Sequence, residues 1–85
     1  MEYVAVTYRS RAQTVRFYEY LAGLGVRGEI INTPKEAGVG CGLSVKVSVS
    51  VFPMVRRAAK SFNGSSFAGF FLVKTVYGKR TVRSV

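Results

Sequence analysis

The only cysteine of the chain, Cys41, lies between Gly40 and Gly42 in a segment that could support thiol chemistry. Glycine adopts positive φ at little steric cost, so the backbone around this cysteine can bend and expose its amide groups. Exposed N–H groups, together with the upstream Lys35, would favour the thiolate, which is the reactive form of cysteine. The residues predict either a reactive cysteine stabilised by Lys35, Gly40 and Gly42, or a tight loop whose cysteine is simply a small, half-buried apolar residue.

The rest of the sequence offers little material for another kind of catalytic or metal site. It contains no histidine, which removes the Cys–His pair and the commonest metal ligand. Its four acidic residues are scattered as Glu2, Glu19, Glu29 and Glu36, so neither a carboxylate pair nor a zinc site is predicted. We therefore expect no metal and no cofactor, and a non-catalytic protein more readily than an enzyme. One cysteine forms no internal disulfide, and the sequence shows no signal peptide and no apolar run of about 20 residues, so it predicts a cytoplasmic protein.

Hydrophobic periodicity predicts strands and helices that alternate along a single domain covering residues 1–85. Strands are expected at 3–8, 26–32, 43–50, 67–77 and 80–85, and helices at 10–23 and 53–63. The predicted apolar face of the first helix comprises Ala12, Val15, Tyr18, Leu21 and Ala22, and that of the second comprises Val55, Ala58, Ala59 and Phe62. In the third strand, alternation predicts a buried side with Leu43, Val45, Val47 and Val49, and an exposed side with Ser44, Lys46, Ser48 and Ser50.

This order, β-α-β-β-α-β followed by one short strand, predicts an α+β fold of the ferredoxin-like type. Two helices would pack on one face of an antiparallel sheet. The C-terminal strand could pair within the sheet or extend one edge to a second copy of the chain. The helix-free face could dock a homodimer mate if its residues form an apolar patch.

The segment around the cysteine also resembles a known signature. The stretch Thr33-Pro34-Lys35-Glu36, followed after four residues by Cys41-Gly42-Leu43-Ser44-Val45-Lys46, is similar to the pattern of the selenium/sulfur carrier protein-like family. The resemblance runs from about residue 3 to residue 47, and it implies a small protein that holds a persulfide or selenide on Cys41 for transfer to a partner enzyme. This chain has Lys35 where that family commonly has arginine, which keeps the charge but loses the planar fork for a bidentate anion contact.

The net charge of +9 favours acidic partners, either proteins or nucleic acid. The expected partners of a carrier are a sulfur or selenium donor and an acceptor enzyme with acidic surfaces. The alternative is a basic RNA-binding or protein-interaction module with an incidental cysteine, because the predicted element order is also that of the RNA-recognition motif. The outward residues of the third strand are Ser44, Lys46 and Ser48, which offer no stacking ring. Nucleic-acid binding is therefore expected to be weak and non-specific at most.

Overall fold

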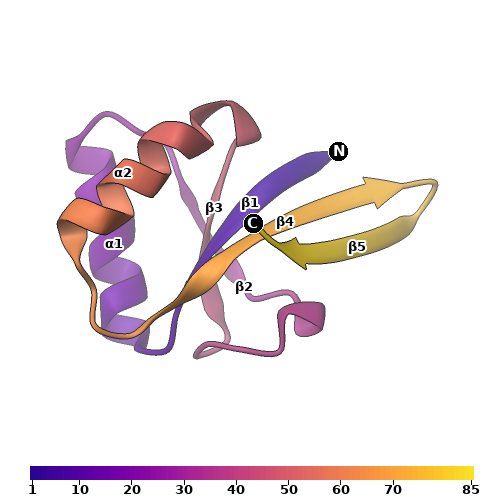
Figure 1. Ribbon diagram of the computed structural model, residues 1–85, viewed down its shortest axis with the longest axis horizontal. Helices are drawn as coiled ribbons and strands as arrows, with labels where there is room; N and C mark the ends of the chain where they lie inside the picture. The colour runs from indigo at the N-terminus through magenta and orange to yellow at the C-terminus, as the bar shows by residue number, and fades with distance from the viewer.

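The strands and helices follow the predicted order, with two short 3-10 turns added. The computed structural model describes residues 1–85. Its elements are β1 (Glu2–Tyr8), α1 (Arg11–Gly23), β2 (Glu29–Asn32), η1 (Lys35–Ala37), β3 (Leu43–Val47), η2 (Val49–Val51), α2 (Phe52–Phe62), β4 (Phe67–Val76) and β5 (Lys79–Ser84) (Figure 1). None of the helices is long and apolar enough to span a membrane.

The five strands form one antiparallel sheet in the order β2-β3-β1-β4-β5. The first strand is central, between β3 and β4, and α1 and α2 lie together on one face of the sheet (Figure 1). This is the ferredoxin-like arrangement that the sequence predicts. Of the two alternatives for the C-terminal strand, the structure shows the first, because β5 pairs with β4 from Phe71↔Ser84 to Val76↔Lys79.

The buried face of α1 differs from the predicted one. Ser10 caps the helix, since its Oγ accepts the Gln13 N–H at 3.2 Å. The structure then buries Thr14, Phe17 and Leu21, whereas Val15 is 39% exposed. Of the predicted face, Ala12 and Ala22 are also exposed, and Tyr18 and Leu21 contact the core. The helix turns a different face to the core because the large ring of Phe17 packs between Tyr8 and Phe62. The ring centroids of these two residues lie 5.4 and 5.3 Å from that of Phe17.

The third strand is shorter than predicted. It ends at Val47, and residues 49–51 form the turn η2 instead of continuing the alternation. Ser48 causes the change, since its Oγ accepts the Ser50 N–H at 3.3 Å and so offers the backbone a turn in place of the strand ladder. Val49, predicted to be buried, is consequently 39% exposed. Ser44, predicted to be exposed, is fully buried.

The second helix presents the predicted face to the sheet. Val55 and Ala58 are buried, and Ala59 and Phe62 pack against the core while remaining partly exposed. The helix ends at Asn63, which adopts the left-handed conformation with φ 53°. Below α1 and α2, the core is formed by alternate residues of the sheet, among them Val4, Val6, Tyr8, Val45 and Val47.

The helix-free face of the sheet is partly covered by the chain itself. Ala5 and Thr7 alternate with the core residues of β1 and so point away from the helices, yet both are fully buried. The segment between β2 and β3, which contains η1 and the cysteine, passes over this face and contacts β5 (Figure 1). The face that could dock a homodimer mate is therefore partly occupied by the cysteine loop.

Candidate functional site

The cysteine loop, residues 33–42, is closed at its base and bent by glycines. The Thr33 N–H donates to the Gly42 carbonyl oxygen at 2.8 Å, which joins the two ends of the loop. Gly38, Gly40 and Gly42 have φ values of 67°, 96° and 94°, a region that favours glycine. At Gly40 a side chain is also excluded by space, because an added Cβ would lie 2.5 Å from the Thr7 methyl carbon.

Cys41 is attached to the end of β1 and turned toward the start of α1. Its N–H donates to the Tyr8 carbonyl oxygen at 3.3 Å. Its Sγ lies 3.7 Å from the Thr14 hydroxyl and 3.7 Å from the Leu43 carbonyl oxygen, and the residue is half-buried. The two contacts differ chemically, since a hydroxyl can donate to a thiolate or persulfide sulfur whereas a carbonyl oxygen can only accept from an S–H.

A chain of hydroxyl groups supports the loop from beneath. The Ser44 Oγ lies 2.9 Å from the Thr7 Oγ1 and 2.8 Å from the Thr33 Oγ1. Thr7, Thr14 and Ser44 are all fully buried. Because each buried hydroxyl has a partner, the group holds the loop without an unpaired polar atom. Sequence reasoning missed these residues, although Ser44 lies directly opposite Thr7 once β1 and β3 are paired.

The other residues predicted for the site lie together on the loop. Lys35, Gly40 and Gly42 line a shallow hollow of about 240 Å³ with Thr33, Pro34, Gly38 and Val39. Lys35 is exposed and takes part in no ion pair. The Cys41 side chain does not line this hollow, since its sulfur contacts Thr14 and Leu43 instead. The structure thus brings three predicted residues to one surface of the loop and turns the sulfur toward α1.

A bidentate ion pair fastens the loop to β5. The Arg80 Nε and Nη2 atoms donate to the two carboxylate oxygens of Glu36 at 3.0 and 2.7 Å. The hydrogen bonds from Arg80, and then a hydrogen bond from the Glu36 backbone, hold the pKa of this carboxyl below its usual value. The hydrogen bonds to the Glu36 side chain in turn raise the pKa of Arg80. No local sequence signal pointed to Arg80, which lies 44 residues away from its partner along the chain.

Tyr8, whose carbonyl oxygen holds the Cys41 N–H, carries a buried hydroxyl without a partner. Its ring is surrounded by the rings of Phe17, Phe62 and Phe67, with centroids 5.4, 5.8 and 5.6 Å away. Burial raises the pKa of Tyr8 from 10.0 to about 12, so this phenol stays neutral at alkaline pH values where an exposed tyrosine ionises.

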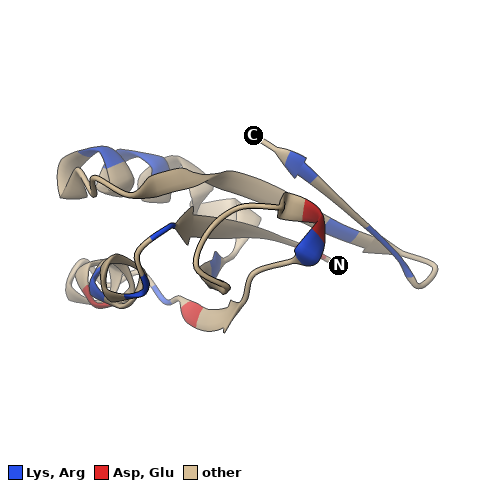
Figure 2. Ribbon diagram, turned by 90° about the horizontal axis from the view of Figure 1, so that it is seen from below, with Lys and Arg blue, Asp and Glu red and all other residues tan.

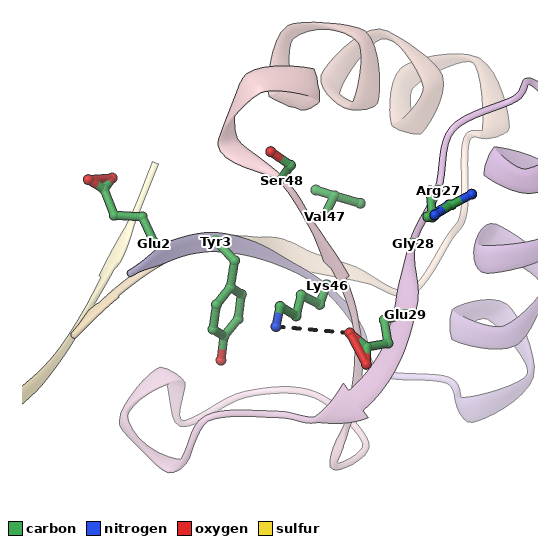
Figure 3. Close-up of a pocket in the computed structure, with 8 residues that line it drawn as sticks. All are labelled: Glu2, Tyr3, Arg27, Gly28, Glu29, Lys46, Val47 and Ser48. Carbon is green, nitrogen blue, oxygen red and sulfur yellow. Dashed lines mark ion pairs between the residues drawn. The ribbon is translucent and has the colours of Figure 1, made fainter. Parts of the chain in front are cut away.

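The largest hollow of the molecule lies on another part of the surface and has a different character. It measures about 460 Å³ and is lined by Glu2, Tyr3, Arg27, Gly28, Glu29, Lys46, Val47 and Ser48 (Figure 3). The Lys46 ammonium group lies 4.9 Å from the centre of the Tyr3 ring and 3.9 Å from the Glu29 carboxylate. Its positive charge is therefore already compensated, and no residue of the cysteine loop lines this hollow.

Comparison with known families gives a match that spans the cysteine loop. The family described as "Putative Se/S carrier protein-like" matches residues 3–65. The chain belongs to this family. The matched range includes the whole cysteine loop, α1 and α2, and it ends before β4 and β5. No curated protein and no solved structure matches the chain.

Proposed function

We propose that this protein is a cytoplasmic carrier that holds a sulfur or selenium atom on Cys41 and passes it to a partner enzyme. The observation that supports the proposal most is the family match over residues 3–65, since this range contains the only cysteine of the chain. The geometry adds a second argument, because the thiol lies on a glycine-bent loop, is only half-buried and has a hydroxyl group 3.7 Å from the sulfur.

Loading would proceed by exchange between sulfur atoms. The Cys41 thiolate attacks the outer sulfur of a persulfide on a donor protein, a new S–S bond forms, and the donor cysteine leaves as a thiolate. In delivery, a cysteine thiolate of the acceptor attacks the outer sulfur and Cys41 leaves as a thiolate. A selenium atom held as a selenopersulfide would exchange in the same way. Because the atom moves between thiols, neither step consumes an external oxidant or reductant.

Residues around the sulfur would serve different states of the carrier. In the resting thiol, the Leu43 carbonyl oxygen can accept the S–H proton. The Thr14 hydroxyl donates to the Ser10 carbonyl oxygen at 3.1 Å, and in the thiolate it would exchange this bond for one to Sγ. A terminal sulfur or selenium atom on Cys41 would have to turn away from α1 to reach the hollow lined by Lys35, Gly40 and Gly42. There the lysine charge and the N–H groups of the loop would offset its negative charge. Glu36 would oppose this less than a free carboxylate, because Arg80 neutralises its charge.

The partners we propose are a donor and an acceptor with acidic surfaces. Of the thirteen lysine and arginine residues, only Lys46, Lys74 and Arg80 form ion pairs, so most of the positive charge faces solvent (Figure 2). Complementary charge would mainly speed the encounter with such partners, and that effect weakens as salt is added.

The proposal can be tested by loading the purified protein with a cysteine desulfurase and free cysteine. We expect the intact mass to rise by one sulfur atom and to return to its original value after reductant. Cys41→Ser should gain no mass, and Thr14→Val should load more slowly than Thr14→Ser, which keeps a hydroxyl group. Equal loading of Cys41→Ser, or a wild type that stays unmodified, would argue against a carrier.

A further inference from the structure

A second hollow, between α2 and the start of β4, has the composition of a ligand site and shares no residue with the cysteine loop. It measures about 330 Å³ and is lined by Arg56, Ala59, Lys60, Asn63, Gly64, Phe67 and Phe70. Phe67 and Phe70 lie beyond the part of the chain that the family matches. A ligand bound in this hollow would therefore be independent of a carrier role for Cys41.

Two aromatic rings meet at this hollow because of an irregularity in β4. In a regular strand, residues 67 and 70 would point to opposite faces of the sheet. The pairing shifts from Thr7↔Gly69 to Tyr8↔Phe67, so β4 carries an extra residue here, and Gly69 adopts a φ of 139°. Such a bulge redirects side chains. As a result the rings of Phe67 and Phe70 lie 4.9 Å apart at 61°.

The rings are held firmly and still reach the surface. Phe67 packs edge-on against Tyr8, and Phe70 packs edge-on against Phe52 at 5.2 Å. The turn before Phe67 is fixed by the Gln13 side chain, whose Oε1 accepts the Ser66 N–H at 2.9 Å. With this support Phe67 remains 39% exposed. An aromatic ring that is rigid and exposed can bind a planar group at little cost in conformational entropy.

Positive charge surrounds the rings, and no carboxylate lies among them. Arg56 and Lys60 line the hollow from α2, and Arg9 donates from Nη1 to the Phe67 carbonyl oxygen at 3.4 Å. None of the three is in an ion pair. A neighbouring hollow of about 340 Å³, lined by Pro53, Arg56, Arg57 and Lys60, continues the basic surface along α2. Figure 2 shows this outer side of α2 in blue without any red.

We propose that this hollow binds a nucleotide, with its base against Phe67 and Phe70 and its phosphate on Arg56 and Lys60. The combination of stacking rings and unpaired cations is the one used for single-stranded nucleic acid, where stacking tolerates any base. An acidic peptide would satisfy the cations but would leave the two rings without a matching planar group. The adjoining hollow with Arg57 would accept a second phosphate. That phosphate could belong to a free nucleotide or to the next position of a single strand.

Fluorescence anisotropy with short labelled single strands tests the site on the full-length protein. Wild type should bind strands of different sequence with similar affinity. Phe67→Leu should weaken binding about tenfold by loss of stacking, whereas Phe67→Tyr should bind as wild type. In the double variant Arg56→Gln, Lys60→Gln, the slope of log affinity against log salt concentration should become less steep by about 0.7 per cation removed. The matched double variant Arg27→Gln, Lys79→Gln should change affinity less.

The competing ligands give distinguishable results. If a nucleoside monophosphate displaces the strand with similar affinity, the ligand is a free nucleotide, and if it competes far more weakly, the ligand is a strand. Both results support nucleotide chemistry. The proposal is overturned if an abasic strand binds as tightly as a normal one, or if Phe67→Leu binds normally while every charge change weakens binding equally. Phe67-dependent binding of an acidic peptide without any binding of strands would also overturn it.

Discussion

At the scale of residues, the Cys41 sulfur depends on groups that are distant in sequence. Cys41 and its flanking glycines are visible in the sequence, because a lone cysteine between glycines is a distinct local pattern. The Thr14 hydroxyl beside the sulfur was not predicted, since Thr14 is not among the residues of the predicted apolar face of α1. The contact between Thr14 and the Cys41 sulfur becomes visible only when α1 and the cysteine loop are both placed against β1.

Gly40 should be the least replaceable residue of the loop. An alanine there would adopt an unfavourable φ of 96° and would meet the Thr7 methyl carbon at 2.5 Å. We expect Gly40→Ala to reduce the free energy of unfolding by about 2–4 kcal/mol, from backbone strain together with overpacking. Gly42→Ala is the matched control, because it has a φ of 94° but open space around its Cβ, and it should cost about 1–2 kcal/mol. Equal losses in urea denaturation would show that the contact with Thr7 is unimportant.

Tyr8→Phe should stabilise the protein, because it removes a buried hydroxyl that has no partner. The expected gain in the free energy of unfolding is about 1–3 kcal/mol near neutral pH. Burial raises the pKa of Tyr8 from 10.0 to about 12, so the unfolded chain loses this proton first and stability falls across that pH interval. The variant should lack this part of the alkaline loss. A destabilised variant at neutral pH would show that the hydroxyl has a partner after all.

At the scale of elements, an ion pair joins the cysteine loop to a strand that the family match does not include. Glu36 belongs to η1, and Arg80 belongs to β5. In the first helix and the third strand, too, a contact with another residue overrides the pattern of the local sequence. Phe17 decides the buried face of α1 by its fit to Tyr8, and the Ser48 hydroxyl ends the β3 alternation.

Arg80→Ala should loosen the cysteine loop without unfolding the protein. Hydrogen exchange of residues 35–42 should become faster at neutral pH, and Lys79→Ala should leave it unchanged. Because the folded-state pKa of Glu36 is lowered, the ion pair stabilises the loop above the usual carboxylate pKa and is lost as pH falls through the lowered value. Wild type and Arg80→Ala should therefore converge in acid. Identical loop exchange in the two proteins at neutral pH would mean that the ion pair does not hold the loop.

At the scale of the whole molecule, the sequence was sufficient for the fold because each element carried its own pattern. Strand alternation, the Ser10 cap and the face of α2 were all readable locally, and together they allow few topologies. The path of the cysteine loop across the sheet was not readable, since it depends on the approach of Gly40 to Thr7 and on Arg80. The stacking site was missed because a bulge in β4 reorients Phe67.

We expect residues 1–85 to unfold as one cooperative domain. The radius of gyration is 11.8 Å, which agrees with about 12 Å for a single compact domain of this length. Circular dichroism in urea should show a single transition, and hydrogen exchange should protect β4 and β1 together because they are paired along seven positions. Separate melting of the β4–β5 hairpin would show that it is a second unit.

The measurement that tests the carrier most directly is cyanolysis of the loaded protein. Cyanide attacks the outer sulfur of a persulfide, which yields thiocyanate and returns the cysteine as a thiolate. After loading by a cysteine desulfurase and removal of that enzyme, the wild type should release about one thiocyanate per chain, as expected for a single persulfide. Cys41→Ser carried through the same steps should release none. The account is contradicted if the wild type releases no thiocyanate while its thiol can be alkylated only after denaturation, because Cys41 would then be a packed structural residue.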